Sequence, residues 1–95
     1  MLPEPLTPPY AKKIILNILK KGSVVYAEPH ALQRMEERDI STLDCVNVLR
    51  GGKVAPAEYE NGSWRYRVYT PRMTVVARFE SELELEIVTA WRDRA

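Results

Sequence analysis

The apolar residues in the first half of the chain recur with the period of an α-helix. An amphipathic stretch runs from Tyr10 to Lys21, and its apolar face consists of Ile14, Ile15, Ile18 and Leu19. Thr7 precedes this stretch as a candidate cap, and Gly22 follows it as a stop. The pattern predicts a first helix over residues 10–21.

A short strand and a second helix are predicted next. Residues 23–27 form an apolar run that suits a strand. Pro29 suits the first position of a helix, because that position needs no backbone donor. We expect this second helix to end near Arg38 or Asp39.

A third helix is bounded by Ser41 and the pair Gly51-Gly52, with Asp44 completing a weak capping box. The apolar period then changes to two residues, which predicts strands over residues 53–59, 64–69, 73–80 and 83–91. Pro56 interrupts the first strand, which favours an edge or a bulge, and Asn61-Gly62 is a strong hairpin signal. In the last strand we expect one face to carry Leu83, Leu85, Ile87, Thr89 and Trp91.

The predicted order of elements is therefore α-β-α-α-β-β-β-β. Its tight connections favour an antiparallel meander of four to five strands, with the three helices packed on one face in a two-layer α+β fold. Residues 1–9 contain four prolines and are expected to form an extended lead-in, followed by a single domain over residues 10–95.

Composition excludes several classes of function. Cys45 is the only cysteine, so we expect no disulfide framework and a reducing, cytoplasmic compartment. One histidine and one cysteine cannot supply a tetrahedral zinc site, and we predict neither a metal nor another cofactor. No run reaches the ~20 apolar residues of a membrane span, and no signal peptide is visible. Because the net charge is only +1, a nucleic-acid site would have to be a local basic cluster.

The second helix carries the only catalytic arrangement that the pattern supports. His30, Arg34 and Arg38 recur at i, i+4 and i+8, which places them along one helical face. An imidazole beside two permanent cations can hold a phosphate and move its proton. The alternative is that His30 is a surface or capping residue. The arginines would then be solvated, or would pair with carboxylates and fix the helix to the sheet.

The strands predict a second basic cluster, on the sheet face away from the helices. This face is expected to carry Arg65, Arg67, Tyr69, Arg78 and Arg92. Guanidinium groups bind phosphates in a bidentate manner, and Tyr69 or Tyr66 would stack a base or donate a proton. The alternative is the polar side of an amphipathic sheet, which Glu84 and Glu86 support.

These residues lie in motifs that resemble a known family. The run His30-Ala31-x-x-Arg34-Met35-x-x-Arg38-x-Ile40-Ser41 closely resembles the opening of the DUF4258 family of small bacterial domains. Asn61-Gly62-x-Trp64-Arg65-Tyr66 and Ile87-Val88-Thr89-Ala90-Trp91 resemble it too, and the likeness spans residues 23–92. Over the longer chain, the order of elements and Trp64-x-x-x-Val68-Tyr69-x-Pro71-Arg72 are similar to the motility quorum-sensing regulator toxins.

Both families resemble the RelE-like toxins, whose fold packs helices on a curved antiparallel sheet. The resemblance implies metal-independent cleavage of RNA, held in check by an antitoxin that is encoded alongside. From the toxins it carries over only Tyr69 and Arg72, whereas His30 matches the DUF4258 motif and has no counterpart in their active site.

We therefore predict a toxin-like, metal-independent endoribonuclease of the mRNA interferase type. The predicted catalytic residues are His30 as base or acid, with Arg34, Arg67, Arg78 and Tyr69. The predicted RNA contacts are Arg38, Arg65, Tyr66, Arg72 and Arg92. The expected partners are RNA and a cognate antitoxin. No membrane association is expected, and the chain could form a homodimer. The alternative function is a non-catalytic protein-interaction or RNA-binding module of the DUF4258 type.

Overall fold

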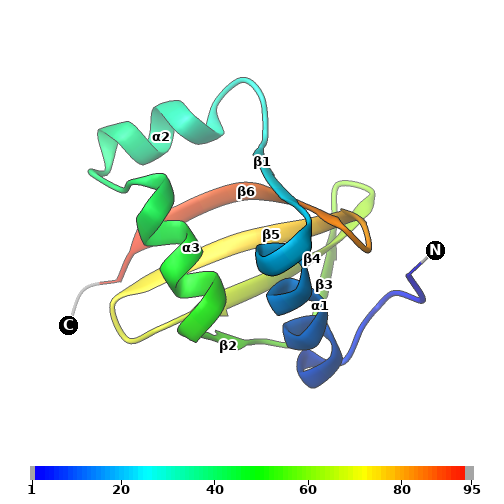
Figure 1. Ribbon diagram of the computed structural model, residues 1–95. Coiled ribbons are helices and arrows are strands. Elements are labelled where there is room, and N and C mark those ends of the chain that lie inside the picture. The colour runs from blue at the N-terminus through cyan, green and yellow to red at the C-terminus, as the bar shows by residue number, and fades with distance from the viewer. Residues whose placement is uncertain (1, 94–95) are drawn as a thin grey trace.

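The computed structural model describes residues 2–93, which form three helices and six strands. In chain order the elements are α1 (Pro8–Lys21), β1 (Ser23–Tyr26), α2 (Ala31–Glu37), α3 (Thr42–Gly51), β2 (Lys53–Val54), β3 (Glu58–Glu60), β4 (Ser63–Tyr69), β5 (Met73–Ser81) and β6 (Glu84–Arg92). The predicted two-layer α+β class is confirmed (Figure 1).

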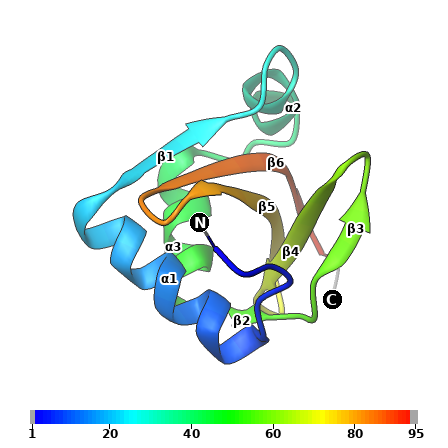
Figure 2. The same ribbon diagram turned by 90° about the vertical axis from the view of Figure 1, so that its right-hand side faces the viewer.

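The sheet has the strand order β1-β6-β5-β4-β2, and β3 pairs with β4. Strands β4, β5 and β6 form the predicted antiparallel meander, whereas β1 pairs with β6 in parallel, from Ser23↔Glu84 to Tyr26↔Ile87. Helices α1 and α3 cover one face of the sheet (Figures 1 and 2). Helix α2 lies alongside β6, beyond the end of β1 (Figure 1).

Helix α1 begins at Pro8, two residues before the predicted range, and ends at Lys21 as predicted. Thr7 is the N-cap residue, and Pro8 takes the first helical position. Ile15 and Ile18 are buried against the sheet. Gly22 follows the helix. Only glycine fits this position, because a Cβ atom here would overlap the carbonyl oxygen of Leu83 in the β5–β6 turn.

The capping box of α3 is formed in full. Ser41 Oγ accepts a hydrogen bond from the backbone N–H of Asp44 at 3.0 Å, and Asp44 Oδ2 accepts one from the N–H of Ser41 at 2.9 Å. The predicted start of this helix is therefore confirmed.

Helix α2 begins later than predicted, at Ala31. Residues 28–30 form a turn, so Pro29 does not open the helix and His30 is its N-cap residue. The helix ends at Glu37, and Asp39 then adopts a left-handed conformation with φ of 57° that redirects the chain toward α3.

The predicted strand over residues 53–59 is split around Pro56 into β2 and β3. Proline has no N–H to donate to a neighbouring strand. Before Pro56, β2 pairs with the C-terminal end of β4, and after it, β3 pairs with the N-terminal end of β4. Asn61 and Gly62 have φ of 49° and 82°, the signs that a two-residue hairpin turn of type I′ requires. The sheet therefore has six strands, whereas the sequence predicts four to five.

A β-bulge in β6 reverses the faces that its side chains occupy. Val76 pairs with Thr89 and Ala77 pairs with Ile87, so Val88 is an extra residue without a partner in β5. Ile87 stays in the core, but Ala90 is now buried as well, at 1% exposure. The expectation that Thr89 and Trp91 share the face of Leu85 and Ile87 is therefore wrong, because one inserted residue inverts the alternation.

The segment before α1 packs against the domain. Leu6 is buried, and its N–H donates a hydrogen bond to the hydroxyl oxygen of Tyr66 at 3.0 Å. This hydroxyl in turn donates to Glu4 Oε2 at 3.0 Å. The ring of Tyr66 contacts Phe79 edge to face, with 5.0 Å between ring centroids. No helix among residues 2–93 has both the length and the apolar character needed to cross a membrane.

We predict that Lys12→Met lowers the free energy of unfolding by about 1–3 kcal/mol. The ammonium of Lys12 donates to the carbonyl oxygens of Leu49, Arg50 and Gly52 at 3.0, 2.7 and 2.7 Å, and thereby closes the C-terminal end of α3. Urea titration measures the change. Lys13→Met, at the exposed neighbouring position, is the control and should leave stability unchanged. An equal loss in both variants would contradict this role.

Asp44→Asn should reveal a pH-dependent part of the stability. The backbone N–H of Ser41 holds the pKa of Asp44 below its ordinary value of 3.8. A carboxyl group whose pKa is lowered by folding stabilises the fold above its unfolded pKa, and this contribution is lost as pH falls through the folded pKa. The difference in the free energy of unfolding between wild type and variant should stay constant above about pH 5 and disappear as the pH falls below 3.8. Chemical denaturation at a series of pH values tests this, and a gap that widens with acid would contradict it.

Candidate functional site

The face of the sheet opposite α1 and α3 contains a small cavity, which we call the open-face hollow. It has a volume of about 130 Å³ and is lined by Glu58, Glu60, Arg65, Arg67, Val76, Thr89 and Trp91. These residues come from β3, β4, β5 and β6, and the β3–β4 hairpin bends away from the helices at its border (Figure 2). The predicted polar face of the sheet is therefore hollowed where its arginines lie.

Two carboxylate–guanidinium pairs line this hollow. Arg67 Nε lies 3.4 Å from Glu58 Oε1, and Arg65 Nη1 lies 4.0 Å from Glu60 Oε2. The side chains of Arg67 and Glu58 are each about half exposed, at 51% and 55%. Exposed pairs of this kind contribute only about 0–1 kcal/mol, so a phosphate can compete for the guanidinium. The Nε atom of Arg65 is buried and has no acceptor among the described residues.

The indole of Trp91 forms another wall of the hollow and is held in place by Asp93. Trp91 Nε1 donates to Asp93 Oδ1 at 2.9 Å, and Thr74 Oγ1 donates to Asp93 Oδ2 at 2.7 Å. Thr74 is the cross-strand partner of Trp91 and is buried. An aromatic ring with a fixed orientation therefore lies beside the two ion pairs.

Helix α2 reaches the hollow through Arg38. Arg38 Nη1 donates to Thr89 Oγ1 at 3.3 Å and to the carbonyl oxygen of Ala90 at 2.7 Å. Since Thr89 lines the hollow, the guanidinium of Arg38 lies at its edge. This contact also holds α2 against β6.

The structure does not bring His30 to the hollow. His30 is exposed at the N-terminal end of α2, and its side chain makes no capping hydrogen bond. Eight residues separate it from Arg38, which is about 12 Å along a helix axis. Arg34 lies between them and is also exposed. The predicted stripe of His30, Arg34 and Arg38 thus follows α2, and only its last member contacts a residue of the hollow.

Arg78 and Arg92 serve other contacts. Arg78 Nε donates to Glu86 Oε1 at 2.6 Å, and its Nη2 pairs with Glu80. The hydrogen bond to Glu86 raises the pKa of Arg78. Arg92 Nη2 donates to the carbonyl oxygen of Asp39 at 2.7 Å and also lies 3.3 Å from Asp44 Oδ2. Neither guanidinium lines the hollow.

The tyrosines divide between the core and the end of β4. The prediction that Tyr66 contacts RNA is wrong, because this side chain is 1% exposed and belongs to the core. Its burial raises the pKa of its hydroxyl to about 12. Tyr69 is 42% exposed and lines a separate cavity with Gly51, Lys53, Thr70 and Pro71. Arg72 is exposed in the β4–β5 turn.

Sequence reasoning missed all four of the acidic, hydroxyl-bearing and aromatic residues of the hollow: Glu58, Glu60, Thr89 and Trp91. The carboxylates were missed because residues 53–59 were predicted as one strand with an edge or a bulge at Pro56, whereas the chain breaks there into two strands and β3 pairs with β4. Thr89 and Trp91 were missed because the bulge at Val88 moves them to this face. The Asn61-Gly62 signal pairs β3 with β4, and so did hold the information that Glu58 and Glu60 oppose Arg65 and Ser63.

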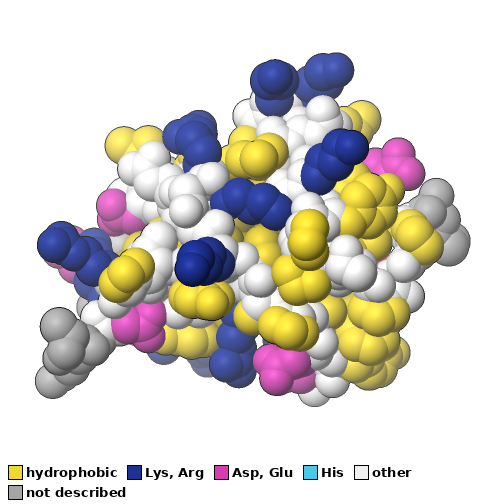
Figure 3. Space-filling model, turned by 90° about the horizontal axis from the view of Figure 1, so that it is seen from below, with side chains coloured by type: hydrophobic (Ala, Val, Ile, Leu, Met, Phe, Trp, Pro, Cys, Tyr) yellow, Lys and Arg dark blue, Asp and Glu magenta, His cyan; other side chains and the backbone are white. Residues whose placement is uncertain are grey.

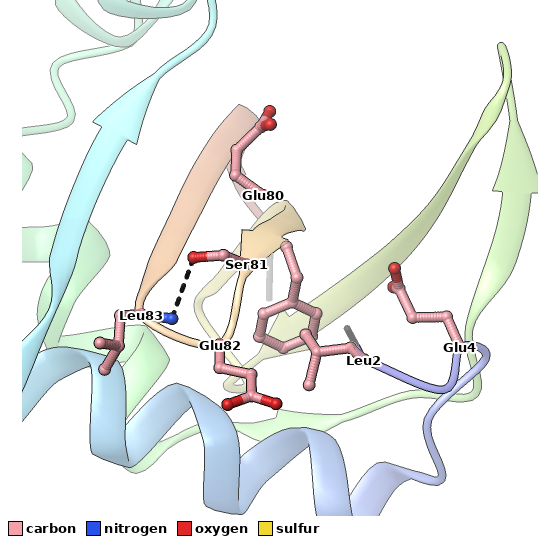
Figure 4. Close-up of a pocket in the computed structure, with 7 residues that line it drawn as sticks. Leu2, Glu4, Glu80, Ser81, Glu82 and Leu83 are labelled. Atoms are coloured by element: carbon pink, nitrogen blue, oxygen red, sulfur yellow. Dashed lines mark hydrogen bonds between the residues drawn. The ribbon is translucent and has the colours of Figure 1, made fainter.

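A larger cavity lies elsewhere and does not suit an anionic ligand. It has a volume of about 490 Å³ and is lined by Leu2, Glu4, Phe79, Glu80, Ser81, Glu82 and Leu83. Leu2 lies in the middle of this pocket, and the carboxylates of Glu4, Glu80 and Glu82 surround it (Figure 4). Three carboxylates at the rim would repel a phosphate.

The face of the molecule seen from below shows no continuous basic patch of the kind that binds nucleic acid. Seen from below, lysine and arginine side chains are scattered among hydrophobic ones (Figure 3). Among residues 2–93, no group of three His, Cys, Asp or Glu side chains is placed to hold a metal ion. The open-face hollow is therefore the candidate site.

Comparison with known proteins gives one match. Residues 27–92 match the family model of a domain of unknown function, DUF4258. This region contains α2, α3 and all strands except β1. No match was found among curated proteins or among solved structures.

We predict that Arg38→Ala detaches α2 from β6. Loss of the hydrogen bonds to Thr89 and Ala90 should lower the free energy of unfolding by about 1–2 kcal/mol and speed hydrogen exchange in α2. Mass-spectrometric hydrogen exchange measures the second effect. Arg34→Ala, one turn earlier on the same helix, is the control and should change neither quantity. Equal exchange rates in the two variants would contradict this anchoring role.

Proposed function

The chain belongs to the DUF4258 family, and we propose that it is a toxin-like, metal-independent endoribonuclease that binds single-stranded RNA at the open-face hollow. The observation that carries this proposal is the pairing of Arg67 with Glu58 at a solvent-open surface, 3.4 Å apart, beside the indole of Trp91. A cation and a proton acceptor are groups that this reaction needs at the phosphate, and an aromatic ring can contact a neighbouring base.

The proposed reaction uses the RNA's own 2′-hydroxyl as the nucleophile. Glu58 takes the proton of this hydroxyl, and the 2′-oxygen forms a bond to the adjacent phosphorus. The bond from phosphorus to the 5′-oxygen of the next nucleotide breaks, and this oxygen takes a proton from a water molecule, which receives the proton held by Glu58 in return. The products are a 2′,3′-cyclic phosphate and a free 5′-hydroxyl.

The arginines would carry the electrostatic part of the catalysis. The guanidinium of Arg67 leaves Glu58 and binds the phosphate, which frees the carboxylate to act as the base. Arg65 has only a long contact with Glu60, and its guanidinium is the second cation for the developing charge. A positioned base contributes about 10²–10⁴-fold, and electrostatic stabilisation is usually larger.

The stripe on α2 would guide the RNA strand to the hollow. Arg38 lies at the edge of the hollow, and Arg34 and His30 continue from it along the helix. We assign phosphate contacts to these two residues, and the base role to Glu58, because Glu58 lines the hollow and His30 does not. Tyr69 and Arg72, toward the other end of β4, would contact RNA beyond the cleaved phosphate.

A cytoplasmic nuclease that degrades messenger RNA needs an inhibitor in the cell that makes it. We therefore propose a cognate antitoxin as the protein partner. An acidic segment of such a protein would compete with RNA for Arg65 and Arg67, which are already able to pair with carboxylates.

A second candidate function is a non-catalytic binding module. The observation that favours it is the pairing of four open-face or edge arginines, Arg65, Arg67, Arg78 and Arg92, with carboxylates. With its charges balanced in this way, the surface would bind a protein of mixed charge, and no RNA would be cut.

Cleavage of a labelled single-stranded RNA in the presence of EDTA tests the proposal. Wild-type protein should release fragments with a 2′,3′-cyclic phosphate, identified by mass spectrometry. Glu58→Gln should lower the rate by about 10²–10⁴-fold and leave RNA binding in place, because it removes the base and keeps the shape of the side chain. Glu36→Gln, on the exposed side of α2, is the matched control and should cleave at the wild-type rate.

The variants also separate the roles of the two proton acceptors. His30→Ala should weaken RNA binding several-fold and retain cleavage at saturating RNA. Loss of cleavage in this variant, with full activity in Glu58→Gln, would return the base role to the imidazole. Wild-type protein that neither cuts RNA nor arrests growth when expressed would leave the binding module as the function.

A further inference from the structure

We infer that Trp91 is the platform on which one unpaired base of the RNA stacks. The inference rests on the proposed function, because it requires RNA to bind at the open-face hollow. It adds that the site recognises a base as well as a phosphate, which gives the reason why the RNA must be single-stranded at the point of cleavage.

The backbone brings Trp91 to this surface by a specific irregularity. With regular alternation from Leu85 and Ile87, residue 91 would face the core. The extra residue Val88 inverts the alternation, and the indole lines the hollow together with Arg65 and Arg67 instead. A large aromatic ring is thereby placed at a partly exposed position, where burial alone does not account for it.

Two hydrogen bonds fix the ring before any ligand arrives. Asp93 accepts from the indole N–H at 2.9 Å and from the hydroxyl of Thr74 at 2.7 Å. Thr74 is 7% exposed, so these two hydrogen bonds connect the ring through Asp93 to a buried side chain. A ring that is already ordered loses little conformational freedom on binding, which favours stacking.

The chemistry of the hollow identifies the ligand class. Its volume of about 130 Å³ is below the roughly 300–1,000 Å³ of cavities that enclose a whole small molecule. It can accept a phosphate and one face of a base from a chain that otherwise stays in solvent. A base within a duplex already stacks on its neighbours, whereas an unpaired base is free to stack on an aromatic side chain.

Binding of base-bearing and abasic oligonucleotides separates stacking from phosphate binding. The host is the full chain with Trp64→Phe, so that Trp91 is the remaining indole. The probes are a 2′-O-methyl hexa-adenylate, which lacks the nucleophile and stays intact, and the same backbone without bases. We expect the base-bearing probe to quench Trp91 fluorescence, and to bind about 5- to 150-fold more tightly in anisotropy measurements with end-labelled probes.

Substitution of Trp91 provides the second arm. Trp91→Leu keeps an apolar side chain and should bind both probes with the affinity of the abasic one, whereas Trp91→Phe should retain part of the preference. Circular dichroism shows whether each variant keeps its fold. A variant that unfolds would leave the fluorescence titration of the host as the deciding measurement.

Three results would overturn the inference, and each would exclude a different part of the account. Equal affinity for the two probes in the host would exclude stacking and leave RNA binding in place. A preference that persists in folded Trp91→Leu would move the stacking to another aromatic residue. Failure of both probes to bind would end the inference and the proposed RNA site together.

Discussion

The extra residue in β6 is the constraint on which the candidate site depends. The bulge at Val88 lets Ile87 and Ala90 both enter the core, and it sends Thr89 and Trp91 to the opposite face. Without it, the hollow would lose the indole and also the hydroxyl that Arg38 contacts. The same irregularity therefore shapes the hollow and anchors α2 beside it. Bulges commonly redirect side chains in this way at functional sites.

Most of the fold was predictable because its local signals agree with its packing. The helical spacing of Ile14, Ile15 and Ile18, the capping box at Ser41 and the Asn61-Gly62 turn each determine a structure within a few residues. What the sequence did not predict depends on contacts between distant segments. The parallel pairing of β1 with β6 is one case, and the register shift between β5 and β6 is another.

The candidate site was predictable only in part, for the same reason. Alternation along β4 placed Arg65 and Arg67 on the open face, since β4 contains no bulge. The helical register of His30, Arg34 and Arg38 was read in a helix that begins later than expected, and only Arg38 contacts a residue of the hollow. The Asn61-Gly62 turn could have placed Glu58 and Glu60 opposite Arg65 and Ser63, but the residues before this turn were not assigned to the open face. Function at this surface thus depends on the competition between these carboxylates and a phosphate for the same guanidinium groups.

That competition can be observed directly at the arginine side chains. Nuclear magnetic resonance resolves the Nε–H signals of individual arginines during titration with a non-cleavable single-stranded RNA. The account predicts saturable shifts for Arg65 and Arg67, at one common affinity, while Arg78 stays unchanged in its contacts with Glu80 and Glu86. Shifts at Arg78 without shifts at Arg67, or no shifts at either, would contradict the claim that the open-face hollow binds RNA.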